Sequence, residues 1–195
     1  MKFADYYNTI LEAKRKKEPE SNVQLPDGTW RRVYSSGDVV YTKTENESDY
    51  HRIDGPAVEW LDGSKRWFVD GEQHRLDGPA VEDTDGSKYW FVNGYRHRID
   101  GPAIIGTDGS KQWYVNDKLH RLDGPAVEWS EGRKEWFVNG KRHRLDGPAI
   151  EWSEGSKEWY VDDKKYSEED FNAIFGVSKD SAVLKQRAAS NDLFN

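Results

Sequence analysis

The sequence predicts a mainly β protein: an elongated, single-layer antiparallel sheet of β-hairpin repeats, a meander or solenoid, with short helical caps at both ends. The tetrad Asp-Gly-Pro-Ala occurs five times, and successive copies are 23 residues apart. Each copy follows His-Arg and one aliphatic residue. A unit this short cannot bury a core alone, so neighbouring copies must stack. The tetrads begin at Asp54, Asp77, Asp100, Asp123 and Asp146.

Within a complete repeat, two runs of residues alternate as strands. In the last copy, Pro148 to Trp152 and Lys157 to Val161 predict a hairpin closed by a Ser-Glu-Gly-Ser turn. Asn139-Gly140 and its equivalents Asp70-Gly71 and Asn93-Gly94 predict the tight turn that follows. Because each repeat adds two strands, equivalent residues of adjacent copies should lie about 9 to 10 Å apart.

Four segments follow from this pattern. Residues 1–18 read as an amphipathic cap helix, 19–50 as a degenerate first repeat and loop, 51–165 as the five repeats, and 166–195 as a C-terminal helical cap. In the degenerate repeat we expect strands at 30–34 and 39–42, preceded by a polar stretch from Glu18 to Leu25. In the C-terminal cap, Ser167 followed by acidic residues predicts a helix start, Gly176 its end, and Ser178 the start of a second helix.

Composition narrows the function classes. The 195 residues carry a net charge of −7 with both signs interleaved, so we expect no attraction to nucleic acid. Cysteine is absent, which excludes thiolate metal sites and cysteine nucleophiles. No apolar run approaches the ~20 residues that cross a bilayer, so membrane contact could only be peripheral. The absence of an export-type segment after Met1 favours the cytoplasm.

Two aromatic rows are expected on opposite sheet faces. Trp67 and its equivalents point to one face, and the residues that follow them point to the other. An exposed row would be a recognition strip. For the Trp row we favour packing, whereas the second row is a candidate binding face. Its members are Phe68, Phe91, Tyr114, Phe137 and Tyr160.

The charged repeat positions form ladders. All five histidines occupy one repeat position: His51, His74, His97, His120 and His143. A spacing of about 9 to 10 Å is too wide for shared coordination of one ion, so we expect no metal and assign His and Asp structural roles in the loop. Five near-identical sets also argue against a single catalytic centre. Each arginine has an Asp two residues along that can hold it, which favours a structural role, although Arg98 and Arg121 remain candidates for binding an anion.

The segment from Trp136 to His143, followed by Gly147 and Gly155, resembles the MORN repeat. The resemblance covers residues 51–165. The chain departs from that family where Arg144 replaces a usual glycine, where the tetrad is added, and where Asp117 and Asp163 replace turn glycines. The resemblance implies a curved antiparallel sheet that serves as a protein-interaction or dimerisation scaffold, with peripheral phospholipid binding in some members.

The sequence therefore predicts a cytoplasmic interaction protein without enzymatic activity or cofactor, which binds a protein partner through an aromatic face or a sheet edge. Arrays of this variant resemble those of uncharacterised proteins in large phages and giant viruses, which implies a binder or inhibitor of a host factor in the host cytoplasm. A homodimer through sheet edges is left open. The alternative is a protein that sequesters a small anionic ligand or nucleotide with the arginine ladder and its neighbouring rings.

Overall fold

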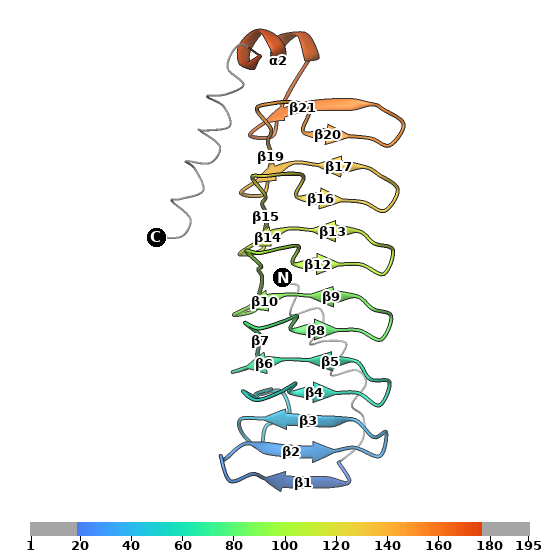
Figure 1. Cartoon of the computed structure of the whole chain (residues 1–195). Coiled ribbons are helices and arrows are strands. Elements are labelled where there is room, and N and C mark those ends of the chain that lie inside the picture. Colours follow the sequence, from blue (N-terminus) through green and yellow to red (C-terminus); the bar gives the residue numbers. More distant parts are fainter. Residues whose placement is uncertain (1–18, 177–195) are drawn as a thin grey trace. The chain divides into compact units, whose positions relative to one another are not determined.

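The computed structural model describes residues 19–176, and antiparallel β-hairpins make up nearly all of their regular structure (Figure 1). The predicted fold class is confirmed. The described residues divide into two compact units, of which unit 1 comprises 19–98 and 103–107 and unit 2 comprises 99–102 and 108–176. The helix expected before Glu18 and the second helix expected after Ser178 lie outside the described residues.

Unit 1 holds two kinds of antiparallel pairing. Its main sheet runs, in order of hydrogen-bonded neighbours, through β1 (Ser21–Gln24), β2 (Trp30–Val33), β3 (Val39–Thr42), β4 (Val58–Glu59), β5 (Lys65–Arg66), β8 (Val81–Glu82), β9 (Lys88–Tyr89) and β12 (Ile104–Ile105). Two small hairpins stand apart from it: β6 (Phe68–Val69) with β7 (Glu72–Gln73), and β10 (Phe91–Val92) with β11 (Tyr95–Arg96).

Unit 2 follows the same plan. Its main sheet runs through β13 (Lys111–Gln112), β16 (Val127–Glu128), β17 (Lys134–Glu135), β20 (Ile150–Glu151), β21 (Lys157–Val161) and β22 (Lys164–Tyr166). The small hairpins are β14 (Tyr114–Val115) with β15 (Lys118–Leu119), and β18 (Phe137–Val138) with β19 (Lys141–Arg142). Helix α2 (Glu168–Phe175) begins after Ser167, whose hydroxyl accepts from the amide of Asp170, and has Gly176 at its C-cap. The predicted start and end of this helix are confirmed.

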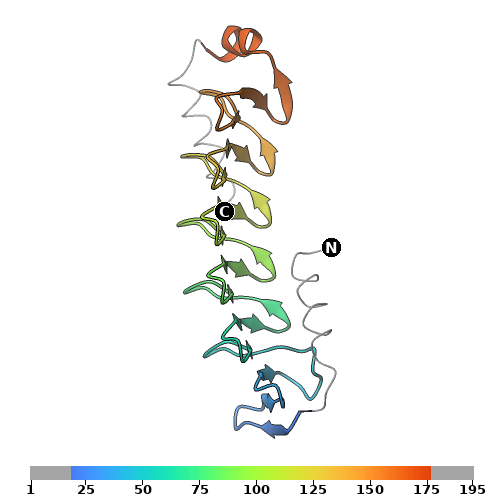
Figure 2. The same cartoon turned by 90° about the vertical axis from the view of Figure 1, so that its right-hand side faces the viewer.

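Each repeat contributes two strands to a main sheet, as predicted, but the second strand changes direction at its tryptophan. The strand expected to run unbroken is divided at Trp67 into β5 and β6. The amide of Trp67 donates to Ala80 of the next main-sheet strand, while its carbonyl accepts from His74 in the small hairpin. Successive repeats take the same path, which Figure 2 shows from the side. Among the five full repeats, the strand runs unbroken in the last one, as β21.

The turn between the strands of a small hairpin places two residues in the left-handed region. In the first repeat, Asp70 has φ 51° and Gly71 has φ 77°, which is the geometry of a type I′ turn. Asp117 and Asp163, which replace the usual glycine, keep this geometry at φ 62° and 64°. Replacing the glycine by aspartate therefore leaves the turn type unchanged. The aspartate adopts a left-handed backbone conformation that costs glycine less energy.

The core of each unit is small and repetitive. In unit 1, the tetrad alanine and the residue after it have no exposed surface in the first two repeats, which concerns Ala57, Val58, Ala80 and Val81. Phe68 and Phe91 are also fully buried. In unit 2, Ala126 and Ala149 are likewise fully buried beside Val127 and Ile150. The last residue of the tetrad is therefore a small apolar residue at a fully buried position, whose carbonyl accepts from the tryptophan amide of the preceding strand, or from the amide of Tyr41 in the first copy.

One strand was not predicted. The stretch read as a polar loop contains β1, which pairs with β2 from Ser21 opposite Val33 to Gln24 opposite Trp30. Three of its four residues are exposed. An edge strand can consist of polar residues because only one of its sides is hydrogen bonded, so it lacks the apolar pattern that marks a buried strand.

Candidate functional site

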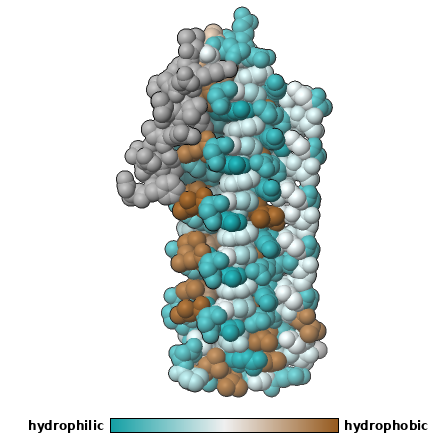
Figure 3. All heavy atoms as spheres, viewed as in Figure 1, coloured by the Kyte–Doolittle hydropathy of each residue, from teal (hydrophilic) through white to brown (hydrophobic). Residues whose placement is uncertain are grey.

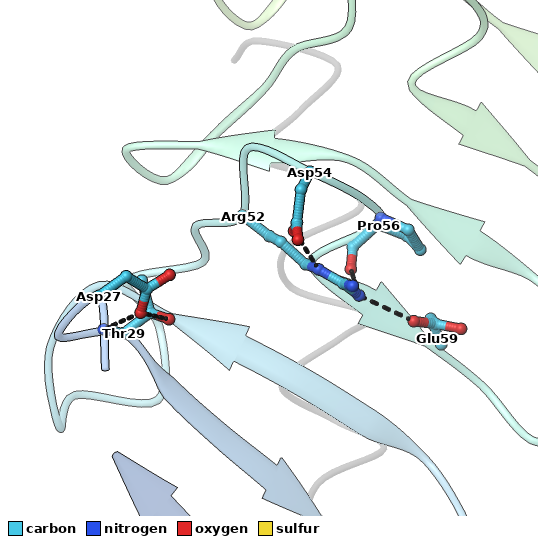
Figure 4. Close-up of polar contacts among 6 residues, drawn as sticks. All are labelled: Asp27, Thr29, Arg52, Asp54, Pro56 and Glu59. Carbon is cyan, nitrogen blue, oxygen red and sulfur yellow. Dashed lines mark hydrogen bonds and ion pairs between the residues drawn. The ribbon is translucent and has the colours of Figure 1, made fainter. Parts of the chain in front are cut away.

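The most regular structure in the chain surrounds the arginine of each repeat, and we call it the arginine clamp. In the first copy it consists of Arg52, Asp54, Gly55, Pro56 and Glu59 (Figure 4). Arg52 Nε donates to Asp54 Oδ1 at 2.8 Å, and its Nη1 donates to the Pro56 carbonyl and to Glu59 Oε1, both at 3.2 Å. One guanidinium thereby joins the loop to strand β4.

The same contacts recur at three further arginines. Arg75 donates to Asp77, the Pro79 carbonyl and Glu82; Arg121 donates to Asp123, the Pro125 carbonyl and Glu128; Arg144 donates to Asp146, the Pro148 carbonyl and Glu151. The expectation that the Asp two residues along holds its arginine is confirmed at all four. In the third repeat Ile105 stands where the others have glutamate.

Each guanidinium also lies over an aromatic ring. Arg75 Cζ is 4.1 Å from the ring centroid of Trp67, and Arg121 Cζ is 4.0 Å from that of Trp113. Arg98 and Arg144 lie equally close to Trp90 and Trp136, and Arg52 lies 4.1 Å from the smaller ring of Tyr41. The predicted packing role of the Trp row is therefore carried by a cation–π contact with the arginine of the next loop.

The clamp explains the glycine of the tetrad. A Cβ atom at Gly78 would lie 2.8 Å from Arg75 Cζ, and one at Gly124 would lie 2.9 Å from Arg121 Cζ. The guanidinium lies so close to the glycine that a Cβ atom there would force it to shift. Each of the first three tetrad residues therefore has a role in the clamp. The Asp carboxylate and the Pro carbonyl accept hydrogen bonds from the arginine, and the Gly leaves room for the guanidinium.

The histidines join each loop to the small hairpin of the same repeat. His51 Nδ1 accepts the backbone N–H of Asp70 at 3.0 Å. His74 and His120 accept in the same way from Asn93 and Asn139, both at 3.2 Å, and His143 Nδ1 lies 2.9 Å from Asp162 Oδ1. These partners are the first left-handed residues of the tight turns, so the histidines hold the turns in place. His97 is half-buried, and its backbone amide donates to the Trp90 carbonyl.

Burial changes the acid–base properties of one histidine. His120 is only 8% exposed, and this burial lowers the pKa of its imidazole, against a smaller opposite effect of the hydrogen bond with Asn139. In the part of the chain that the structure describes, no group of three or more His, Cys, Asp or Glu side chains is placed to hold a metal ion.

The candidate binding row of Phe and Tyr side chains needs correction. Phe68 and Phe91 have no exposed surface and Tyr114 is 8% exposed, so these three rings form core between the main sheet and the small hairpins. Phe137 and Tyr160 are half-buried, with Arg142 Cζ 5.9 and 5.5 Å from their ring centroids. Alternation correctly separated the two rows, but the strand breaks at Trp67, Trp90 and Trp113, and the rings that follow these breaks are buried.

The arginines proposed for anion binding have different surroundings. Arg121 is a clamp arginine with three acceptors and a ring beneath it. Arg98 lies over Trp90. Among the ladder aspartates, Asp54, Asp77 and Asp123 keep at least 80% of their side chains exposed while they accept from arginine, and Asp146 keeps 43%.

The exposed residues that sequence reasoning passed over are the aliphatic ones between Arg and Asp. Ile53 is 84% exposed, Leu76 81% and Ile99 69%. Each is held on a loop whose neighbours are fixed by the clamp. The sequence signal was present, since this position is Ile or Leu in all five copies, although nothing buries it in the first three.

No protein-family model matches the chain, and a comparison with curated proteins finds no relative. The fold and the clamp themselves define the class: a β-hairpin repeat protein in which an arginine of the loop lies over the preceding aromatic ring and, in four of the five repeats, fastens the loop to its own strand. Over residues 19–176, no helix is long and apolar enough to cross a membrane.

Proposed function

We propose that this chain is a non-enzymatic repeat scaffold that binds a protein partner. The observation that carries the proposal is the exposure of large aliphatic side chains at one repeat position, on loops that the clamp makes rigid. Figure 3 shows separate hydrophobic patches on an otherwise hydrophilic face. A loop that is already ordered loses little conformational entropy when its side chains bind a partner, which favours association.

Within unit 1, Ile53 and Leu76 are the residues on which we base the interface. They stand one repeat apart, about 9 to 10 Å if each repeat adds two strands. Beside each lies an exposed aspartate, Asp54 or Asp77, whose charge is balanced by its clamp arginine. A partner surface with apolar side chains at this spacing would cover both residues. It would not have to desolvate an unpaired charge, because both aspartates are paired with arginine.

This proposal replaces the aromatic face as the recognition surface, because Phe68, Phe91 and Tyr114 are buried. The resemblance to arrays of large phages and giant viruses makes a host protein the first partner to test. Binding of an anion along the arginine ladder has less support, since Arg52, Arg75, Arg121 and Arg144 already contact acceptors of their own loops.

The test is quantitative affinity capture with tagged full-length protein, comparing wild type with the double variant Ile53→Lys, Leu76→Lys. Proteins retained by wild type and lost from the double variant would support the proposal. The matched control is Lys65→Ala, Lys88→Ala, which changes two main-sheet side chains away from these loops and should retain the same proteins. Equal retention by all three proteins would contradict the proposed surface.

A second arrangement is a homodimer through β1. In the described part of the chain β1 is an edge strand, paired only with β2, and Val23 on it is 50% exposed. Open strand edges pair readily with further strands. Light scattering of wild type and of Val23→Pro tests it: a dimer that becomes monomeric in the variant supports edge pairing, and a monomeric wild type contradicts it.

A further inference from the structure

A groove with a volume of about 480 Å³ lies in unit 1 between the β1–β2 turn and the first clamp loop. Its wall on the side of the turn includes Asp27, Thr29 and Arg31, and its opposite wall includes Tyr41, His51 and Asp54. Figure 4 shows Asp27 and Thr29 facing the loop that carries Arg52 and Asp54. Volumes of this size are typical of small-molecule sites.

The groove exists because the degenerate repeat departs from the pattern at three positions. The pairing of Val33 with Val39 corresponds to that of Glu59 with Lys65, which aligns Arg31 with the buried Ala57 and Tyr41 with Trp67. The same alignment places Pro26 where later repeats have the clamp arginine. A long cation thus replaces a small buried residue, a smaller ring replaces tryptophan, and proline replaces the clamp arginine.

Two hydrogen-bond donors line this groove, one on Arg31 and one on Tyr41. Arg31 and Tyr41 are directly opposite each other on paired strands, which puts both side chains on one sheet face. Among the interactions of the described residues, neither the Arg31 guanidinium nor the Tyr41 hydroxyl has a hydrogen-bond partner. His51 also lines the groove, and its Nδ1 accepts the amide of Asp70 and lies 3.1 Å from Asp70 Oδ1.

Two carboxylates complement these donors. Asp27 Oδ1 accepts the amide and hydroxyl of Thr29 at 2.9 and 2.6 Å, and the side-chain hydrogen bond is the main reason why the pKa of this carboxyl is lowered. Asp54 accepts from Arg52 through Oδ1. The second oxygen of each carboxylate has no donor among the residues that the structure describes.

We propose that the groove binds a small zwitterion of the amino-acid type. Its carboxylate lies against Arg31 and the hydroxyl of Tyr41, and its ammonium group lies against Asp27 and the second oxygen of Asp54. A simple anion would satisfy the donors but face two carboxylates, and a simple cation would face the guanidinium groups of Arg31 and Arg52, both of which line the groove. Only a ligand with both charges pairs with both sets. This site does not depend on the protein-binding proposal.

Saturation-transfer NMR of the full chain with each standard L-amino acid tests the proposal, followed by titration of those that bind. The variants are Arg31→Ala and Asp27→Asn, of which the second keeps an oxygen to accept from Thr29. Matched controls are Lys65→Ala and Asp85→Asn; Asp85 likewise accepts the amide of a turn residue, Ser87, but does not line the groove. Thermal unfolding of each variant checks that it folds.

The expected result is saturable binding that weakens about tenfold or more in both groove variants and is unchanged in both controls. N-acetylated and carboxamide forms of the same amino acid should bind weakly, because each lacks one charge. Absence of binding for every amino acid at millimolar concentration would overturn the proposal. The proposal would also be overturned if only Arg31→Ala lost binding and the wild type still bound the N-acetylated amino acid. That result would define a site for simple anions.

Discussion

Gly78 lies directly beneath the guanidinium of Arg75, so close that a Cβ atom there would be 2.8 Å from Cζ. Gly78 is not among the residues with positive φ, so the backbone itself would accept alanine. The glycine is therefore required by the arginine and not by the turn. The glycine of the tetrad is thus explained by its contact with the arginine two residues before the tetrad.

We predict that Gly78→Ala destabilises the protein by about 1–3 kcal/mol, because the added methyl forces the guanidinium away from Trp67 and its acceptors. Urea unfolding measures the loss. In an Arg75→Ala background the same substitution should cost much less, since the clash is gone. Equal costs in the two backgrounds would show that Gly78 and Arg75 are not coupled.

Gln73 is a second position with a clear expectation. Its side chain has no exposed surface, and neither amide atom has a hydrogen-bond partner. The equivalent residue of the third repeat is Leu119, which pairs with Tyr114 as Gln73 pairs with Phe68. Gln73→Leu should therefore raise the free energy of unfolding by about 1–3 kcal/mol, because it removes an unsatisfied buried amide.

Thermal and urea unfolding of Gln73→Leu check this prediction, with Gln24→Leu as control. Gln24 is on the edge strand, and its amide donates to the exposed Gly28 carbonyl, so its replacement should give no gain. A destabilised Gln73→Leu would mean that a bonded water satisfies the amide in solution.

The buried imidazole of His120 predicts a pH dependence. Its pKa is lowered in the folded state from the ordinary 6.5, so the unfolded chain binds the proton first as pH falls. The contribution of His120 to the free energy of unfolding is fully present above about pH 6.5. It is lost progressively as the pH falls from that value to the folded-state pKa. Stability should therefore fall more steeply with acidification in wild type than in His120→Gln.

Unfolding free energies at pH 8 and at pH 5.5 measure this difference, and the histidine NMR signals give the folded-state midpoint. Asp77 also contributes at lower pH: the hydrogen bond from Arg75 lowers the pKa of its carboxyl, so its contribution is present above the ordinary value of 3.8 and is lost as pH falls below it. Parallel slopes for wild type and His120→Gln above pH 5 would contradict the assignment to His120.

The sequence predicted the elements for which local chemistry decides the outcome. The tight turns at Asp70-Gly71 and Asn139-Gly140, the start of the C-terminal helix at Ser167 and the pairing of Arg with the following Asp depend on residues close in the chain. The two-strand advance of each repeat follows from the same turns. These features needed no knowledge of which surface is covered.

The features that were missed depend on contacts between distant residues. Alternation at Trp67 and Phe68 shows that they point to opposite faces, but the strand break between them depends on the backbone bonds of Trp67 to Ala80 and His74, which alternation does not reveal. Strand β1 carries no apolar pattern, because it is an exposed edge. The groove beside Arg31 results from a register that only the folded pairing reveals.

The central claim is that the arginine of each repeat is part of the fold and not a ligand site. Urea unfolding of Arg75→Ala and Arg75→Lys tests it most directly. Arg75 is 22% exposed and contacts two carboxylates, a carbonyl and a ring. Both variants should lose about 3 kcal/mol, because lysine cannot reach this set of acceptors from one planar group. Wild-type stability in Arg75→Ala would contradict the claim and make the arginine row available for anion binding.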